Sequence, residues 1–269
     1  FFFKQKTAYE ITYGDWSSDV CSSDLEPGRA APARRRRWKG FRMSRAGTPT
    51  PAFHESLAAQ HIELEPGEIE RLGTHLHMLL EANERFNLTA IRDPAEAWVR
   101  HVADSLSLVP FLGETGAREV VDLGSGGGFP GIPLAIVMPD VRFTLVESVG
   151  KKARFLQEVV QRLELANVTV LQERAEQVAE FKGGLRESFD AVVCRAVGAL
   201  ASLVELSLPL VRVDGWLIAI KGEKAPEEIE GAARALHELH GEVAATHRTP
   251  ASRRSSNAFA NDGGSTTGS

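Results

Sequence analysis

From residue 118 to residue 222 the sequence alternates short apolar runs with segments of helical periodicity. The apolar runs include EVVDLG, RFTLVES, NVTVLQ, FDAVVCRA and GWLIAIKG, and helical segments such as KKARFLQEVVQRLEL stand between them. Strands that read as continuous apolar runs are buried on both faces, which is typical of parallel sheets covered by helices on both sides. The sequence therefore predicts an α/β fold with a mostly parallel, doubly wound sheet.

Two helical segments precede the predicted sheet. The first lies within residues 54–83, where Pro66-Gly67 stands ahead of apolar residues at helical spacing: Ile69, Leu72, Leu76, Leu79 and Leu80. The second follows Asp93, which can cap it, and its apolar stripe consists of Trp98, Val102, Leu106 and Val109. We therefore expect a small helical cap over residues 43–112 and a sheet domain over residues 113–247.

The two ends of the chain differ from the rest in composition. Residues 1–25 show neither helical nor strand periodicity and resemble a translated sequencing-adapter peptide, so we expect them to lie outside the fold. The stretch up to residue 42 is rich in Pro, Ala and Arg, and Met43 is the expected start of the protein. Residues 248–269, rich in Ser, Gly, Thr and Asn, predict a disordered tail of the kind that a frameshift produces.

Composition limits the class of protein. No run of about 18 apolar residues occurs, which argues against a membrane span, and Cys21 and Cys194 are too far apart to form a metal-ligand motif. We expect a monomeric, cytoplasmic protein without a metal site. Between residues 43 and 245, 19 Lys and Arg residues stand against 30 Asp and Glu residues, a net charge of −11. RNA could therefore bind only through a local basic patch.

The sequence VVDLGSGGGFPGIPLA, residues 120–135, contains five glycines and two prolines between a predicted strand and a predicted helix. Such loops bind nucleoside triphosphates, dinucleotides or S-adenosylmethionine. A triphosphate-binding loop requires Lys followed by Ser or Thr where this chain has Ile132-Pro133, which argues against a triphosphatase. The dinucleotide pattern GxGxxG is present from Gly126 to Gly131, but in so glycine-rich a loop it discriminates little.

Two carboxylates favour S-adenosylmethionine over the other ligands. Asp122 ends the strand before the loop, where it would repel a pyrophosphate and attract the ammonium and sulfonium groups of S-adenosylmethionine. Glu147 ends the next strand, 25 residues later, and can accept hydrogen bonds from both ribose hydroxyls. The pattern predicts a methyltransferase. A dinucleotide-dependent oxidoreductase and a cofactor-binding protein without catalysis are the alternatives.

Several blocks of the sequence resemble the bacterial small-subunit ribosomal RNA methyltransferase G family, also called glucose-inhibited division protein B. They are NLTAIRDPAEAWVRHVADSL, VVDLGSGGGFPGIPLAIVMPDVRFTLVES, KKARFLQEVV, FDAVVCRA and IKG, and the likeness covers residues 54–245. The resemblance implies a class I, Rossmann-like methyltransferase. It would use S-adenosylmethionine to methylate N7 of one guanine in the 16S ribosomal RNA of the small ribosomal subunit.

The resemblance also implies cofactor contacts at Gly124, Phe129, the pair Ala175-Glu176, and Arg195. A glycine at position 124 lets the backbone approach the methionine part of the cofactor, and Glu176 offers an acceptor near the adenine. For Arg195, a structural ion pair with Asp122 or Glu147 is the alternative. The complete expected cofactor site comprises Asp122, Gly124, Gly126, Phe129, Glu147, Ala175, Glu176 and Arg195.

Guanine N7 carries a lone pair and no proton, so we expect no general base and no catalytic residue in the strict sense. Alignment of N7, methyl and sulfur for in-line displacement would supply the catalysis. We expect His101 and Asp104 to serve the structure or to position RNA. Basic residues near the active edge would contact RNA phosphates: Arg92, Arg100, Lys151, Lys152, Arg154, Lys221 and Lys224.

The chain departs from the family pattern after HGEV, residues 240–243. Members of the family continue with a strand, a hairpin and a final strand beside GWLIAIKG, whereas this chain continues into RTPASRRSSNAFANDGGSTTGS. We therefore expect the last strand to be missing and the edge of WLIAI to be exposed, which would be an aggregation hazard.

Overall fold

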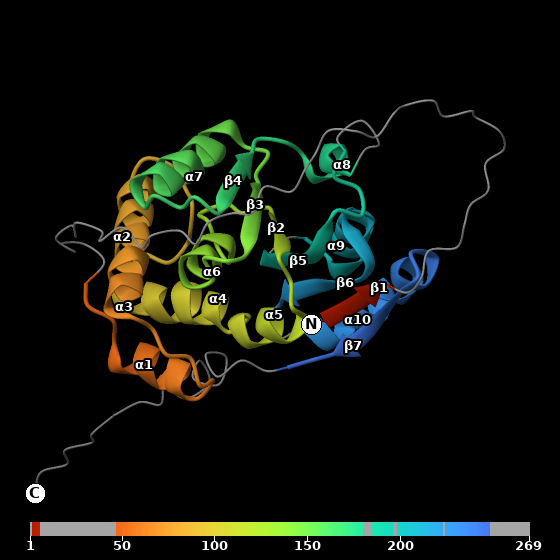
Figure 1. The fold of residues 1–269 in the computed structure, drawn as a ribbon, viewed down its shortest axis with the longest axis horizontal. Coiled ribbons are helices and arrows are strands. Elements are labelled where there is room, and N and C mark those ends of the chain that lie inside the picture. Colours follow the sequence, from red (N-terminus) through yellow and green to blue (C-terminus); the bar gives the residue numbers. More distant parts are fainter. Residues whose placement is uncertain (1, 6–46, 180–183, 196–197, 223, 248–269) are drawn as a thin grey trace, which may run out of the picture.

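The computed structural model describes residues 2–5, 47–179, 184–195, 198–222 and 224–247. A seven-stranded sheet with the order β4-β3-β2-β5-β6-β1-β7 runs through the molecule (Figure 1). The strands are β1 (Phe2–Gln5), β2 (Glu119–Leu123), β3 (Arg142–Val146), β4 (Val168–Leu171), β5 (Phe189–Arg195), β6 (Val211–Ile220) and β7 (Gly241–Ala245).

Helices precede the sheet and cover both of its faces (Figure 1). Those before the parallel strands are α1 (Pro51–Ala58), α2 (Pro66–Asn83), α3 (Pro94–Ala97), the π-helix η1 (Trp98–Ala103), α4 (Asp104–Leu106) and α5 (Val109–Thr115). The others are α6 (Gly131–Val137), α7 (Gly150–Arg162), α8 (Ala175–Val178), α9 (Leu200–Ser207), the 3-10 helix η3 (Leu208–Leu210) and α10 (Ala225–Glu238).

Five neighbouring strands, β4-β3-β2-β5-β6, are all parallel. Residues of one strand alternate between the two faces: Val121 packs with α9 and α10, whereas Val120 packs with α5 and α6. All four residues from Val120 to Leu123 are buried, as the continuous apolar runs predict. The predicted α/β fold with a doubly wound parallel sheet is confirmed.

The helical cap shares its apolar core with the sheet. Leu72, Leu76 and Leu79 of α2 are completely buried in one cluster with Leu145 of β3 and Leu156 of α7. Accordingly, α7 (green) lies beside α2 (orange) in Figure 1. The cap is thus part of the support for the carboxyl ends of the central strands.

The second helical segment begins as predicted and then departs from α-helical geometry. The Asp93 side chain accepts a hydrogen bond from the Glu96 amide at 3.0 Å, and Pro94 occupies the first turn. Of the predicted apolar stripe, Trp98, Val102 and Leu106 are completely buried, whereas Val109 is half-buried at the start of α5. From Trp98 to Ala103 the helix is a π-helix, a variation that the 3.6-residue apolar periodicity did not indicate.

The expectation that residues 1–25 lie outside the fold is wrong for Phe2–Gln5. This segment forms β1 and pairs antiparallel with β6 on one side and with β7 on the other. Phe2, Phe3 and Lys4 lie opposite Ile218, Leu217 and Trp216. The edge of WLIAI is therefore covered, because the main chain of β6 accepts any extended segment whose amides and carbonyls match its register, whatever the side-chain periodicity.

The remaining expectations for the chain ends, including Met43 and the tail over 248–269, lie outside the described residues. Among the residues that the structure describes, no helix is both long and apolar enough to cross a membrane.

Candidate cofactor site

The glycine-rich loop joins β2 to α6 at the carboxyl edge of the parallel strands, where open α/β sheets bind ligands. The amides of Gly124 and Ser125 donate to the Val146 carbonyl of β3 at 2.9 and 3.1 Å. Gly124 has a φ of 70°, and Gly128 has a φ of 92°, a left-handed conformation that other residues adopt at a cost. Glycine at these two positions therefore allows the chain to turn sharply over the end of β3.

Asp122 lies beneath this loop and is completely buried. Its Oδ2 accepts a hydrogen bond from the Gly131 amide at 3.0 Å, and a Cβ at position 131 would approach that oxygen to 2.7 Å. Its Oδ1 has no hydrogen-bond partner among the described residues. Burial raises the pKa of the Asp122 carboxyl to about 7. Asp122 thus holds the start of α6 against β2, and it titrates near neutrality.

This buried carboxyl makes a testable contribution to the pH dependence of stability. The folded pKa lies above the ordinary value of 3.8, so ionisation destabilises the fold progressively as pH rises from about 4 to about 7. Asp122→Asn keeps an acceptor for Gly131 and cannot ionise. We expect the free energy of unfolding of the native chain to fall relative to that of the variant by on the order of 2 kcal/mol between pH 5 and pH 8. Urea titrations at several pH values measure it, and a pH-independent difference would contradict the expectation.

Glu147 connects the second strand end to the same loop. Its Oε2 accepts a hydrogen bond from the Gly126 amide at 3.0 Å, and its Oε1 accepts one from the Val149 amide at 2.8 Å. The side chain is almost completely buried. A carboxylate has further lone pairs and can accept additional hydrogen bonds. Glu147 therefore orders the loop and retains the capacity to bind a hydroxyl.

A cavity of about 370 Å³ opens beside Gly124. The residues that line it are Leu123, Gly124, Val146, Ser148, Glu173, Arg174, Ala175, Glu176, Leu203 and Leu206. It brings together three of the predicted cofactor residues, Gly124, Ala175 and Glu176. Its volume is within the range of small-molecule sites.

Some lining residues of this cavity were not predicted individually. Ser148 follows the end of β3 and could have been found from the same strand-end signal that identified Glu147. Leu203 and Leu206 are apolar residues of α9, and an apolar residue in a helix does not by itself indicate a ligand wall.

Phe129 and Arg195 are absent from that lining and belong to a second cluster beside the loop. The Phe129 ring stacks on His75 of α2 with centroids 4.5 Å apart and on His101 of η1 with centroids 4.8 Å apart. The Arg195 guanidinium lies 5.1 Å from the Phe129 ring centroid. We call His75, His101, Phe129 and Arg195 the aromatic cluster. It joins the cap, the glycine-rich loop and the end of β5.

Arg195 forms hydrogen bonds and an ion pair with residues of the cap. It donates to the Arg100 carbonyl at 2.8 Å and to His101 Nδ1 at 3.0 Å, and its guanidinium lies 3.9 Å from Asp104. The ion pair of Arg195 is thus with Asp104. Among the described residues, Arg195 forms no ion pair with Asp122 or Glu147, which were the expected partners if its role was structural.

His101 is held in one tautomer by these contacts. Because Nδ1 accepts from Arg195, Nε2 carries the proton and donates to Thr89 Oγ1 at 2.8 Å. Burial and the neighbouring Arg195 lower the pKa of His101 to about 3, so the ring is neutral at pH 7. A neutral ring with both nitrogens engaged agrees with the expected positioning role.

The predicted RNA-contacting residues differ in their surroundings. Lys151 and Lys152 stand in the first turn of α7, and Lys151 Nζ lies 5.5 Å from the Phe86 ring centroid.

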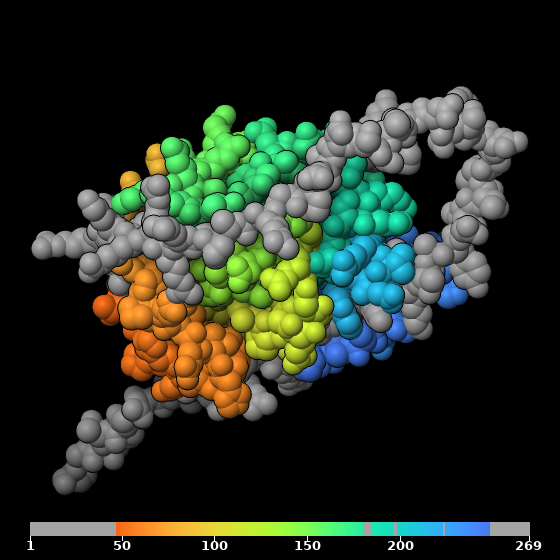
Figure 2. All heavy atoms as spheres, viewed as in Figure 1, coloured from red at the N-terminus to blue at the C-terminus, as the bar shows by residue number. Residues whose placement is uncertain are grey.

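Two of the predicted RNA-contacting residues are already paired with carboxylates. Arg100 pairs with Glu96 at 2.7 Å, and Lys221 pairs with Glu228 at 2.6 Å with its side chain only 6% exposed. Those exposed to solvent are Arg92, Arg100, Lys151, Arg154 and Lys224, and Lys152 is half-buried. Figure 2 shows α7 (green) at the surface of the molecule.

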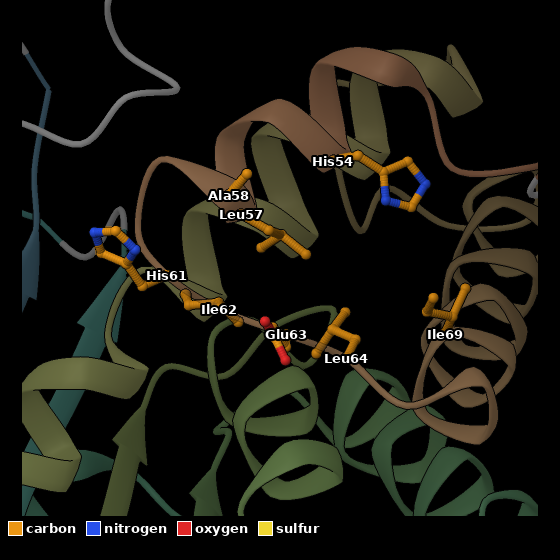
Figure 3. Close-up of a pocket in the computed structure, with 8 residues that line it drawn as sticks. All are labelled: His54, Leu57, Ala58, His61, Ile62, Glu63, Leu64 and Ile69. Atoms are coloured by element: carbon orange, nitrogen blue, oxygen red, sulfur yellow. The ribbon is translucent and has the colours of Figure 1, made fainter.

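A second cavity, of about 550 Å³, lies in the cap between α1 and α2 (Figure 3). His54, His61 and Ile69 are among the residues that line it. It contains none of the predicted site residues. Among the described residues, no group of three or more His, Cys, Asp or Glu side chains is arranged to hold a metal ion.

Known proteins resemble this chain over most of its length. An O-methyltransferase from Bacillus cereus, crystallised in complex with SAH, matches with a TM-score of 0.45 and 18% identity over 68% of this chain and 84% of that chain. The ribosomal RNA small subunit methyltransferase G of Sorangium cellulosum is 47% identical over 204 residues, 76% of this chain and 84% of that protein. The protein of the same name from Chloroflexus aggregans is 45% identical over 191 residues, 71% of this chain and 79% of that protein.

The family described as rRNA small subunit methyltransferase G matches residues 68–256, which include α2 from Glu68 onward, the glycine-rich loop and every strand from β2 to β7. This range contains both the cavity beside Gly124 and the aromatic cluster. The blocks that suggested the resemblance contain Gly124, Phe129, Glu147, His101 and Arg195, whereas His75 and the pair Ala175-Glu176 lie outside them. The chain belongs to the rRNA small subunit methyltransferase G family.

Proposed function

We propose that this chain transfers the methyl group of S-adenosylmethionine to N7 of a guanine in the 16S ribosomal RNA of the small ribosomal subunit. The observation that carries the proposal is the cavity at the carboxyl edge of the parallel strands, lined by Gly124, Ala175 and Glu176, in a chain of this family. We further propose that the protein acts as a cytoplasmic monomer.

The residues around the cavity fit S-adenosylmethionine better than a dinucleotide. Gly124 presents backbone without a side chain, and Leu123 and Leu203 supply apolar walls. Glu173 and Glu176 lie at the cavity and Glu147 lies next to it, so carboxylates outnumber Arg174. This charge suits a ligand with an ammonium and a sulfonium group and opposes a pyrophosphate. We therefore assign the adenine side to Ala175-Glu176, the ribose to Glu147 and the methionine part to Gly124.

The bound cofactor supplies an electrophilic methyl group on a sulfonium. The protein then has to hold the guanine in line with that methyl, because N7 has a free lone pair and releases no proton. In the aromatic cluster, His101 is neutral with both nitrogens in hydrogen bonds, and Arg195 is fixed by the Arg100 carbonyl, His101 and Asp104. These groups position the acceptor side of the site, and alignment of this kind can contribute about 7–11 kcal/mol to catalysis.

The test is methyl transfer from labelled S-adenosylmethionine to unmethylated 16S RNA and to small-subunit particles. N7-selective cleavage locates the modified base. Label at N7 of one guanine is the expected result. Label at another atom would show that guanine N7 is not the methyl acceptor. Binding of NAD without methyl transfer would favour the oxidoreductase alternative, and binding of S-adenosylmethionine without transfer would favour a non-catalytic protein.

We infer that the first turn of α7 supplies part of the RNA contact surface. Lys151 and Lys152 come shortly after the end of β3, which lies at the strand edge that carries the cofactor cavity. Arg92, Arg154 and the remaining predicted basic residues would extend this surface, with Arg100 and Lys221 contributing less because each is already paired with a carboxylate.

Replacing both lysines tests this surface. We expect Lys151→Ala with Lys152→Ala to weaken RNA binding and to reduce the slope of log K against log salt by about one to two, since each lost phosphate contact releases one counterion fewer. Cofactor affinity should not change. Arg142→Ala with Arg234→Ala removes the same charge at exposed sites, Arg142 at the start of β3 and Arg234 on α10, and serves as the control. Identical salt slopes in the two double variants would remove the lysines from the RNA surface.

A further inference from the structure

His75 connects the helical cap to the glycine-rich loop. It belongs to α2, is completely buried, and its Nε2 lies 2.8 Å from the Gly127 carbonyl oxygen, 52 residues along the chain. A carbonyl oxygen only accepts hydrogen bonds, so Nε2 carries the proton and donates it. Within the described part of the chain, Nδ1 has no hydrogen-bond partner. The contact with Gly127 is therefore the polar interaction that orients this ring.

The loop backbone packs directly against the same helix. A Cβ at position 127 would lie 2.6 Å from Leu79 Cδ1, and one at position 128 would lie 3.0 Å from His75 Nε2. The His75 ring also stacks on Phe129 at an interplanar angle of 21°. Three consecutive loop residues thus contact α2, and the place of the loop depends on the cap as well as on the sheet.

Two neighbouring loop residues are held from opposite sides. The Gly126 amide donates to Glu147 after β3, and the Gly127 carbonyl accepts from His75. The loop begins with Gly124, which lines the cofactor cavity. A buried carbonyl oxygen that receives no hydrogen bond is unfavourable. Replacing His75 by a residue without an N–H donor would therefore favour a different loop conformation. Burial lowers the pKa of His75 to about 4, which keeps the ring neutral at pH 7.

We propose that His75 is a positioning residue that holds the glycine-rich loop in its cofactor-binding conformation through the Gly127 carbonyl. The cap then contributes to cofactor binding without contacting the cofactor. This inference rests on the proposed use of S-adenosylmethionine at the cavity beside Gly124.

The experiment compares three variants of the full chain by calorimetric titration with S-adenosylmethionine and by thermal unfolding. His75→Phe keeps a ring on Phe129 but has no donor, and His75→Gln offers an amide N–H near the position of Nε2. His77→Phe removes a half-buried histidine of the same helix, whose ring faces Glu81, and is the matched control. We expect His75→Phe to lose affinity about tenfold, His75→Gln to stay within about threefold of the native chain, and His77→Phe to bind as the native chain does.

The difference in cofactor affinity between His75→Phe and His75→Gln decides the proposal. If His75 served only in packing, His75→Phe, which keeps a ring, would bind the cofactor better than His75→Gln. Equal affinity of His75→Phe and the native chain would overturn it, as would equal losses in His75→Phe and His75→Gln. If His75→Phe does not fold, His75→Asn takes its place, since its shorter amide cannot reach Gly127, and the same contrast with His75→Gln is required. A native chain that binds no S-adenosylmethionine would overturn the proposed function itself, whereas native binding with unaffected variants would overturn only the role of His75.

Discussion

Gly124→Val is expected to abolish measurable binding of S-adenosylmethionine, with a loss of affinity of at least about 100-fold. Gly124 has a φ of 70°, where a β-branched residue is strained by about 1–3 kcal/mol. The new side chain would also enter a cavity that Gly124 lines. Both effects act on the same short loop, which is held by the Val146 carbonyl and Glu147. Calorimetric titration and methyl transfer both report the loss.

Gly113→Val is the control for this substitution. Gly113 lies in α5, and a Cβ there would meet no atom within 4 Å. This variant should bind the cofactor as the native chain does and should keep its stability, because valine has a slightly higher helix propensity than glycine. Native affinity in Gly124→Val would remove the glycine-rich loop from the cofactor site.

A chain that begins at Met43 is expected to lose about 2–4 kcal/mol of stability, which corresponds to a fall in Tm of roughly 5–15 °C for a domain of this size. In the structure, β1 lies between β6 and β7 and pairs with both. Without it, the amides and carbonyls along Trp216–Ile218 would form an open edge next to a detached β7, which favours association between chains. Thermal unfolding and hydrogen exchange of the β7 amides measure the effect.

Point substitutions in β1 distinguish the effect of lost strand pairing from the effect of a shorter chain. Phe3 lies opposite Leu217 on one side and Val243 on the other. Phe3→Pro removes a backbone donor from this position and should reproduce much of the loss, whereas Phe3→Ala keeps the amide and should retain the pairing. An unchanged Tm in both the shortened chain and Phe3→Pro would show that the sheet does not depend on β1.

Much of the fold was predictable because it depends on local patterns. The apolar runs at β2, β3 and β5 are continuous, so they indicate strands buried on both faces, and these strands are parallel in the structure. The leucines of α2 recur at helical spacing and are buried. By contrast, β1 could not be predicted, because a strand of four residues that pairs on both sides is determined by the register of β6 and β7 and leaves no periodic signal.

The candidate site was predictable at the strand ends and much less so elsewhere. Asp122, Glu147 and Ala175-Glu176 each follow or end a strand, and parallel strands place such residues on one edge of the sheet. The detailed roles of the two carboxylates depend on burial: Asp122 lies beneath the loop and holds Gly131, and Glu147 accepts two backbone amides. The cavity walls from α9 and the stacking of Phe129 on two histidines depend on contacts between distant segments.

The sequence by itself determined the parallel α/β fold, the position of the glycine-rich loop and the family, because these follow from apolar periodicity and from contiguous motifs. Only the tertiary structure decided that β1 covers β6, that Arg195 pairs with Asp104, and that His75 reaches the Gly127 carbonyl. Each of these contacts joins residues that no local pattern relates. Their geometry depends on how the cap, the loop and the sheet pack together, since a hydrogen bond forms only when both partners are brought to within about 3 Å by the rest of the fold.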